Sequence, residues 1–239
     1  MANFRLALSA GHYKYTANHC HKSLDPNETT EWQLNSRIAE KVEKLLKAYD
    51  GIEVLRLDDR TGEVEVFLTE RSTAANNFGA DFYLAIHHDA AGKVFDGGGI
   101  TAFVYTTPKA ASLEWQKDLY NALITATGLV GDRATPLAKK NLHEVREPYA
   151  PAVLLELGFM DSEKDVPIIL SEDFANKCAE AIVSVIVKRA GLKKKATAEK
   201  TDGKAYRVQV GYFKEKANAE AMLQKIKAAG FEAFIAVEE

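Results

Sequence analysis

Residues 151–160 read Pro151-Ala152-Val153-Leu154-Leu155-Glu156-Leu157-Gly158-Phe159-Met160. This continuous run of small and branched apolar residues, opened by a proline and closed near a glycine, is typical of a buried strand. One carboxylate, Glu156, lies inside the run. An ionised carboxylate in apolar surroundings is costly unless a cation, a metal or a catalytic role accounts for it. Glu156 therefore either pairs with an arginine, such as Arg146, or takes part in chemistry.

The composition is that of a globular protein with one sizeable core. The chain has 239 residues, of which 46% are hydrophobic and 27% are charged, and this leaves room for a small second unit. The formal net charge of -3 excludes the strongly basic signature of a nucleic-acid-binding protein. Cys20 and Cys178 lie far apart and form no CxxC pair, so a metal would need histidine and carboxylate ligands.

The N-terminal residues lack a basic region followed by a long apolar run, which predicts a protein made in the cytoplasm without a signal peptide. No apolar run approaches the roughly 20 residues of a membrane-spanning helix, so we expect no membrane insertion. If the protein acts outside the cell, something else must release it.

Strand-like and helix-like segments alternate on both sides of the central run. The expected strands are 4–9, 52–57, 81–89, 100–105 and 151–159, and the expected helices are 30–49, 67–77, 110–127 and 172–190. This alternation predicts an α/β domain over residues 1–190, with a largely parallel, twisted sheet flanked by helices on both sides.

One carboxylate lies on the apolar face of the first helix. Thr30 and Gln33 have the spacing of a capping box, which places the start of the helix. Its buried face is expected to consist of Leu34, Ile38, Val42, Leu45 and Tyr49. Glu31 lies three residues before Leu34 and so belongs to the same face, where a carboxylate needs a partner.

Histidines lie at the carboxyl ends of two predicted strands, where α/β sheets place their chemistry. His12 comes just after the first strand, and the strand at 81–89 carries His87 and His88 near its end. Successive side chains on a strand point to opposite faces, so only one of the adjacent pair faces a given site. His19 and His21 lie in a polar stretch and are interpreted as exposed loop residues.

His12, Glu31, His87 and Glu156 together offer a hydrolytic zinc site. Two histidines and one carboxylate, with a fourth position open to water, form a common catalytic ligand set. A further carboxylate is needed to carry the proton from water to the leaving amine. No local spacing such as HExxH identifies the set, so the residue types leave it as a hypothesis.

Five segments in order resemble the zinc-dependent N-acetylmuramoyl-L-alanine amidases of the amidase-3 family. They are Ala10-Gly11-His12, Glu31 with Leu34-Asn35, 68–71 with Ala75-Asn76, 85–90 and 151–159, and the resemblance extends over about residues 4–190. That family usually carries Asp-Pro-Gly-His-Gly-Gly at the first ligand. The run 9–14 here keeps the histidine and lacks the flanking glycines.

The resemblance implies that His12, Glu31 and His87 bind one Zn²⁺ and that Glu156 is the catalytic carboxylate. The bond cut is then the amide between the lactyl group of N-acetylmuramic acid and L-alanine of the stem peptide in peptidoglycan. The same register selects His87 over His88, which has no assigned role. Arg146 is interpreted as a salt-bridge residue rather than a substrate contact.

The C-terminal part predicts a linker and a second unit. Residues 191–204 are rich in lysine and read as a linker. Residues 205–239 read as one small βαβ unit and are similar to half of a SPOR peptidoglycan-binding repeat. Two half repeats from two chains would cover each other's sheet edge and apolar face, so we predict a homodimer through residues 205–239.

Several readings of the biological role stay open. The first is a phage or prophage endolysin released by a holin, and a sporulation or mother-cell autolysin is nearly as compatible. A protein that binds the cell wall without catalysis is disfavoured, because all four chemical residues are present. A zinc peptidase acting on another substrate is the third alternative.

Overall fold

The computed structural model describes residues 3–195 and 208–237, and the chain divides into two compact units, Met1–Lys195 and Ala196–Glu239. Most of the predicted linker lies outside the described residues. Its first residues belong to the first unit instead, because β8 (Lys193–Lys194) pairs antiparallel with β2 (Tyr49–Asp50). Among the described residues, no helix is long and apolar enough to cross a membrane.

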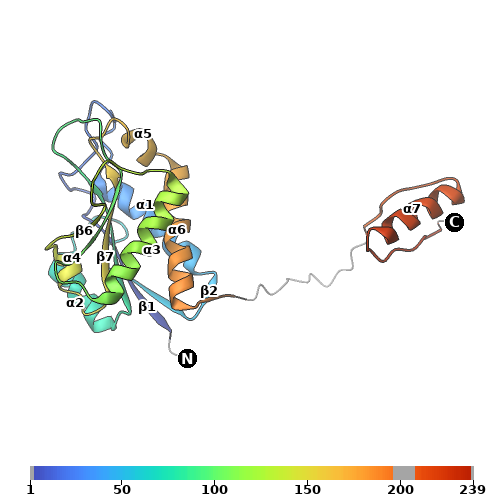
Figure 1. Ribbon diagram of the computed structural model, residues 1–239, viewed down its shortest axis with the longest axis horizontal. Coiled ribbons are helices and arrows are strands. Elements are labelled where there is room, and N and C mark those ends of the chain that lie inside the picture. Colours follow the sequence, from blue (N-terminus) through green and yellow to red (C-terminus); the bar gives the residue numbers. More distant parts are fainter. Residues whose placement is uncertain (1–2, 196–207, 238–239) are drawn as a thin grey trace. The chain divides into compact units, whose positions relative to one another are not determined.

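A β-sheet forms the centre of the first unit (Figure 1). It has six strands in the order β3-β1-β4-β7-β5-β6. Its strands are β1 (Phe4–Ala10), β3 (Ile52–Arg56), β4 (Phe82–Asp89), β5 (Ile100–Val104), β6 (Leu137–Lys139) and β7 (Ala152–Phe159). The pairs β1–β3, β1–β4, β4–β7 and β5–β6 are parallel, which confirms the predicted sheet. The central run is β7, between two neighbouring strands.

Two strands, β5 and β6, run against the other four, since β5 is antiparallel to β7 and parallel to β6. A parallel return needs a crossover of a dozen or more residues, usually containing a helix. The connection from β4 to β5 is a shorter loop, residues 90–99, so the chain turns back on itself there.

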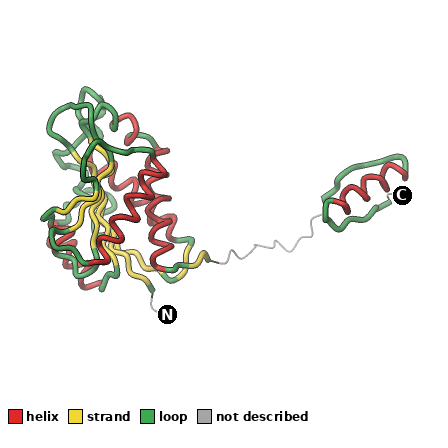
Figure 2. Tube along the Cα trace, in the orientation of Figure 1, coloured by secondary structure: helices red, strands yellow, loops and turns green. Residues whose placement is uncertain are grey.

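Helices cover both faces of the sheet, as the tube in Figure 2 shows. α1 (Glu31–Leu46), α3 (Ala110–Thr127) and α6 (Glu172–Ala190) pack on one face. α2 (Leu68–Phe78) and α4 (His143–Arg146) lie on the other, and α5 (Val166–Ile169) follows β7. The capping box at Thr30 is present, with the Gln33 amide N–H donating to the Thr30 hydroxyl.

The alternation of side chains along β4 decides where the histidines point. Phe82, Leu84 and Ile86 belong to the core beneath α1, α3 and α6. Tyr83 and Ala85 belong to the smaller core beneath α2 and α4. Continuing the period of two, the odd-numbered His87 faces the α2 and α4 side, and His88 faces the opposite side.

The predicted apolar face of the first helix needs one correction at its C-terminal end. Leu45 is exposed, and Leu46 is buried in its place. From Val42 the buried stripe continues four residues on rather than three, and helix geometry allows either spacing. Tyr49 packs against the core from β2, after the helix has ended.

The second unit contains the expected helix, α7 (Lys216–Ala228). The flanking segments 208–213 and 231–237, predicted as strands, are not paired as strands in the described part of this unit. A strand needs a hydrogen-bonded neighbour, and these two short segments do not supply one to each other. Apolar side chains in both segments are consequently exposed.

Candidate metal centre

The four residues predicted to do chemistry line one pocket in the first unit. His12 follows β1, Glu31 opens α1, His87 lies near the end of β4 and Glu156 lies in β7. His12, His87 and Glu156 come together because β1, β4 and β7 are neighbouring parallel strands that point to the same edge of the sheet. Glu31 reaches the same pocket from the first turn of α1. The other lining residues are Asn18, His88, Asp89, Ala90 and Met160.

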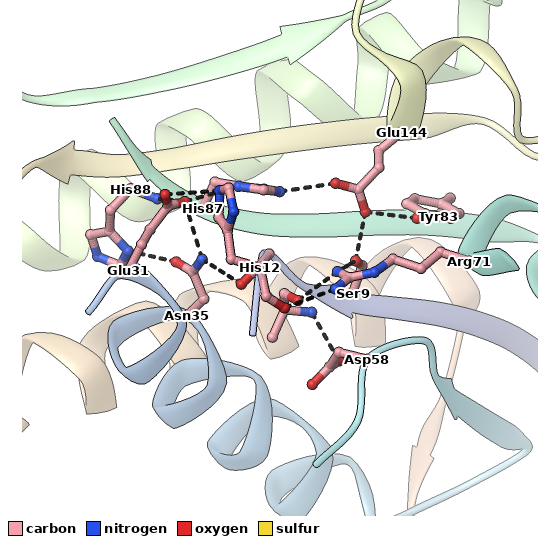
Figure 3. A network of polar contacts seen from close by, with 12 residues as sticks. Ser9, His12, Glu31, Asn35, Asp58, Arg71, Tyr83, His87, His88 and Glu144 are labelled. Carbon is pink, nitrogen blue, oxygen red and sulfur yellow. Dashed lines mark hydrogen bonds and ion pairs between the residues drawn. The ribbon is translucent and has the colours of Figure 1, made fainter. Parts of the chain in front are cut away.

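The Glu31 carboxylate lies between the two histidines. Its Oε2 is 2.9 Å from His12 Nε2, and its Oε1 is 2.9 Å from His87 Nδ1 (Figure 3). One ligand atom from each residue lies within 4.8 Å of the other two. Two imidazole nitrogens and one carboxylate oxygen match the donors that a catalytic Zn²⁺ takes, so this group fits a single metal ion.

The backbone at His12 is held in an unusual conformation. His12 has a φ of 66°, in the left-handed region that non-glycine residues rarely adopt. Arg71 holds this turn, because its Nη1 donates to the Ala10 carbonyl at 2.7 Å and its Nη2 donates to the His12 carbonyl at 2.9 Å. The Asn35 side chain donates to the Gly11 carbonyl at 3.2 Å. Strain of this kind persists only where surrounding contacts hold it, and it is common at functional sites.

Gly11 is required here for space. A Cβ placed on Gly11 would overlap the ring of His87, because the imidazole packs directly against the glycine backbone. The His12 and His87 rings meet edge to face with centroids 5.3 Å apart. The turn after β1 therefore determines the positions of both the His12 and the His87 rings.

Glu31 is buried and remains ionised. Burial by itself would raise the pKa of Glu31, but the hydrogen bonds from His12 and His87 outweigh it and hold the pKa well below its usual value. The backbone N–H of His88 and the side-chain amide of Asn18 also donate to this carboxylate, at 3.2 and 3.0 Å. A fixed negative charge thus lies among the three candidate ligands.

The pKa of Glu156 is shifted in the opposite direction to that of Glu31. Burial raises the pKa of Glu156 to about 8, although the charge of His87 acts against the rise. Its Oε2 is buried and has no hydrogen-bond partner within the part of the chain that the structure describes. The alternative ion pair with Arg146 does not form, because the Arg146 guanidinium contacts Glu147 and Asn141. Arg146 is a surface salt-bridge residue, as predicted.

The remaining histidines and Cys20 lie outside this ligand group. His88 faces α1, where its Nδ1 lies 2.8 Å from Asn35 Oδ1, and burial lowers its pKa to about 3. His19 and His21 are exposed loop residues, as expected. Burial raises the pKa of the Cys20 thiol to about 12, which disfavours the thiolate that a metal needs.

A buried carboxylate that was not predicted from the sequence, Glu144, lies on the short helix α4. Its Oε2 lies 2.9 Å from His87 Nε2, and its Oε1 accepts from the Ser9 hydroxyl at 2.6 Å and the Tyr83 hydroxyl at 2.8 Å. Burial alone would raise the pKa of Glu144, but the His87 hydrogen bond and the charges of His87 and Arg71 bring it to about 2. The sequences of β1 and β4 contained a signal for such a residue. Ser9 and Tyr83 bring hydroxyls into the core, where each needs a hydrogen-bond partner.

Comparison with known proteins fixes the family. Residues 6–188 match the family described as N-acetylmuramoyl-L-alanine amidase. The chain belongs to this family. It is therefore a peptidoglycan amidase, a hydrolase, and the resemblance of the sequence segments is confirmed. Residues 179–238 match the SPOR domain, in a stretch that begins inside α6.

Curated relatives come from bacteria and from a phage. The chain is 31% identical over 224 residues to the sporulation-specific N-acetylmuramoyl-L-alanine amidase of Bacillus subtilis (strain 168), covering 92% of this chain and 82% of the relative. It is 27% identical to the endolysin of Bacillus phage SPP1 over 172 residues, covering 71% of this chain and 62% of the relative.

Solved structures confirm the fold. The catalytic domain of CwlV, an N-acetylmuramoyl-L-alanine amidase from Bacillus (Paenibacillus) polymyxa var. colistinus, is 26% identical with a TM-score of 0.70. That match covers 80% of this chain and 99% of the CwlV domain. The N-acetylmuramoyl-L-alanine amidase of Clostridium difficile 630 has a TM-score of 0.71 at 22% identity, covering 80% of this chain and 98% of that one.

Proposed function

We propose that the chain is a zinc-dependent amidase that cuts the bond between the lactyl group of N-acetylmuramic acid and L-alanine of the stem peptide. His12, Glu31 and His87 would hold one Zn²⁺, and Glu156 would carry the proton. The observation that supports this proposal is the convergence of three ligand atoms within 4.8 Å in a pocket that also contains the half-buried Glu156. When bound, zinc supplies the Lewis acidity that amide hydrolysis needs.

The two carboxylates of the pocket suit different tasks. Glu31 is ionised and contacts both imidazoles, so it orients the ligands and balances positive charge. Burial raises the pKa of Glu156 to about 8, near neutral pH, which suits a group that both accepts and releases a proton. Glu156 takes a proton from the attacking water and delivers it to the alanine nitrogen, which leaves as a free amine.

Two biological roles are considered, a bacterial autolysin that lyses the mother cell and a phage endolysin that lyses the host. The sporulation-specific relative aligns with 92% of this chain and the phage endolysin with 71%, so the alignment favours a mother-cell autolysin. An endolysin that reaches the wall after holin-mediated release is the second candidate. Both roles use the same bond cleavage and the same residues.

The bond cleaved is tested by mass spectrometry of fragments released from purified peptidoglycan. We expect intact stem peptides that begin with a free L-alanine amine, because the amidase reaction leaves the peptide whole. Fragments cut within the peptide would identify a zinc peptidase instead. Folded protein that sediments with the wall and releases nothing would identify a protein that binds without catalysis.

The second unit supports a further proposal, a module of residues 205–239 that binds the glycan strand and pairs with a second copy. Apolar side chains are exposed in the segments that precede and follow α7 in the sequence. They are Val208, Val210, Tyr212, Phe231, Phe234 and Val237. Val208, Val210 and Tyr212 alternate in the sequence, as residues on one face of a strand do. A second copy supplies the missing strand neighbours and covers these side chains.

We expect the full chain to sediment as a concentration-dependent dimer and the Phe234→Asp variant to sediment as a monomer. Phe234 is 76% exposed in the single chain, so a charge there should hardly change the stability of the monomer. In the dimer the same charge would be buried at the contact and would destabilise it. Lys227→Gln on α7 is the matched control and should remain dimeric. A full chain that stays monomeric at every concentration, with α7 folded by circular dichroism, would contradict the pairing.

A further inference from the structure

Glu144 joins the two strands that carry the histidines. It is only 3% exposed, and the groups that contact its carboxylate come from two strands. Ser9 belongs to β1, while Tyr83 and His87 belong to β4 (Figure 3). A buried carboxylate is stable only when its oxygens are well paired, and Glu144 receives three such contacts.

The two carboxylates flanking His87 contact different ring nitrogens. Glu144 Oε2 lies 2.9 Å from His87 Nε2, whereas Glu31 Oε1 lies 2.9 Å from His87 Nδ1. Nδ1 is on the side of Glu31 and His12, where the candidate ligand atoms gather. A proton on Nε2, donated to Glu144, leaves the Nδ1 lone pair for the metal.

We propose that Glu144 is a positioning residue, which fixes the ring orientation and the Nε2–H tautomer of His87 so that Nδ1 serves as the metal ligand. This inference rests on the proposed metal role of His87. It adds a residue outside the predicted ligand set and names the atom through which that residue acts. Carboxylates that accept from metal-binding histidines commonly have this effect on ligand orientation and basicity.

The same carboxylate is connected to the turn that carries His12. The Ser9 hydroxyl donates to Glu144 and accepts from Arg71 Nη1 at 2.8 Å. Arg71 in turn binds the carbonyls of Ala10 and His12. An Arg71–Ser9–Glu144–His87 chain thus runs from the backbone of one histidine to the ring of the other. Arg71 also compensates the buried charge of Glu144.

The Glu144→Gln variant tests the proposal through metal affinity. We expect zinc affinity, measured by competition with a chromogenic chelator, to fall by about 10–100-fold, because the loss of a hydrogen bond to a metal-binding histidine typically costs this much. Tyr83→Phe removes another donor to the same carboxylate and leaves His87 untouched, so its affinity should stay near that of the parent. Glu147→Gln, three residues away on the surface, is the second control.

A purely structural role for Glu144 predicts a different pattern. Glu144→Gln and Tyr83→Phe would then lower the thermal midpoint alike, and both would bind zinc as tightly as the parent. That result would overturn the proposal.

An independent measurement needs no substitution. In the zinc-loaded parent chain, ¹⁵N NMR of the histidine rings should show the proton of His87 on Nε2. A proton on Nδ1 would overturn the inference even if Glu144→Gln failed to fold. The inference about Glu144 and the proposed function can fail independently. A chain that binds zinc through His87 and cuts another bond would refute the function and leave the role of Glu144 standing.

Discussion

Glu156→Gln is expected to lower the rate of stem-peptide release by about 10²–10⁴-fold, the usual contribution of a positioned proton-transfer group. The amide keeps the size of the side chain but cannot take a proton from water and return it to the leaving nitrogen. Because Glu156 lies beside the candidate ligands without being one of them, zinc affinity should stay that of the parent. The rate is measured by mass spectrometry of the released peptides, and the affinity by chelator competition.

Glu163→Gln is the matched control for this experiment. Glu163 follows β7 closely in the chain but is exposed, so the same chemical change there should leave the rate unchanged. Full activity in the Glu156→Gln variant would assign the proton transfer to another group. Loss of zinc together with activity would instead make Glu156 a ligand.

Glu31→Gln is expected to have the largest effect on the metal. Glu31 contacts both histidines and brings the anionic ligand, so its replacement should weaken zinc binding by more than the roughly 100-fold that loss of a supporting hydrogen bond costs. Amidase activity should disappear with the metal at low free zinc. Metal content after dialysis, measured by plasma mass spectrometry, and peptide release report the two effects.

Glu40→Gln on the same helix controls for the loss of a charge from α1. Glu40 is exposed, so this variant should keep one zinc per chain and normal activity. If Glu31→Gln bound zinc like the parent, the ligand set of His12, Glu31 and His87 would be wrong.

Periodicity in the sequence was sufficient to predict where Glu31 and the adjacent histidines lie. Glu31 shares the helical repeat of Leu34 and Ile38, and all three are buried. The period of two in β4 required His87 and His88 to face opposite sides. The structure separates them in this way, since the His87 ring contacts Glu144 on α4 and the His88 ring contacts Asn35 on α1. Both predictions concern regular elements, in which neighbouring residues determine the direction of a side chain.

Glu144 could not be predicted in this way. It lies in a four-residue helix after an irregular stretch, among charged residues that suggest a surface. Its partners are 57 to 135 residues away in the chain, so only the folded structure brings them together. The reversed direction of β5 is a similar case, because the sequence of a strand does not record which neighbour it will pair with.

The packing of His87 on Gly11 also bears on how related sequences are read. A chain can keep both histidines and both glutamates and still carry a larger residue at the position of Gly11. Such a chain has no room for the imidazole in its present place, since the first added carbon would overlap the ring. We expect that substitution alone to abolish amidase activity in a chain that keeps both histidines and both glutamates. The glycine therefore belongs among the positions by which active members are distinguished from inactive ones.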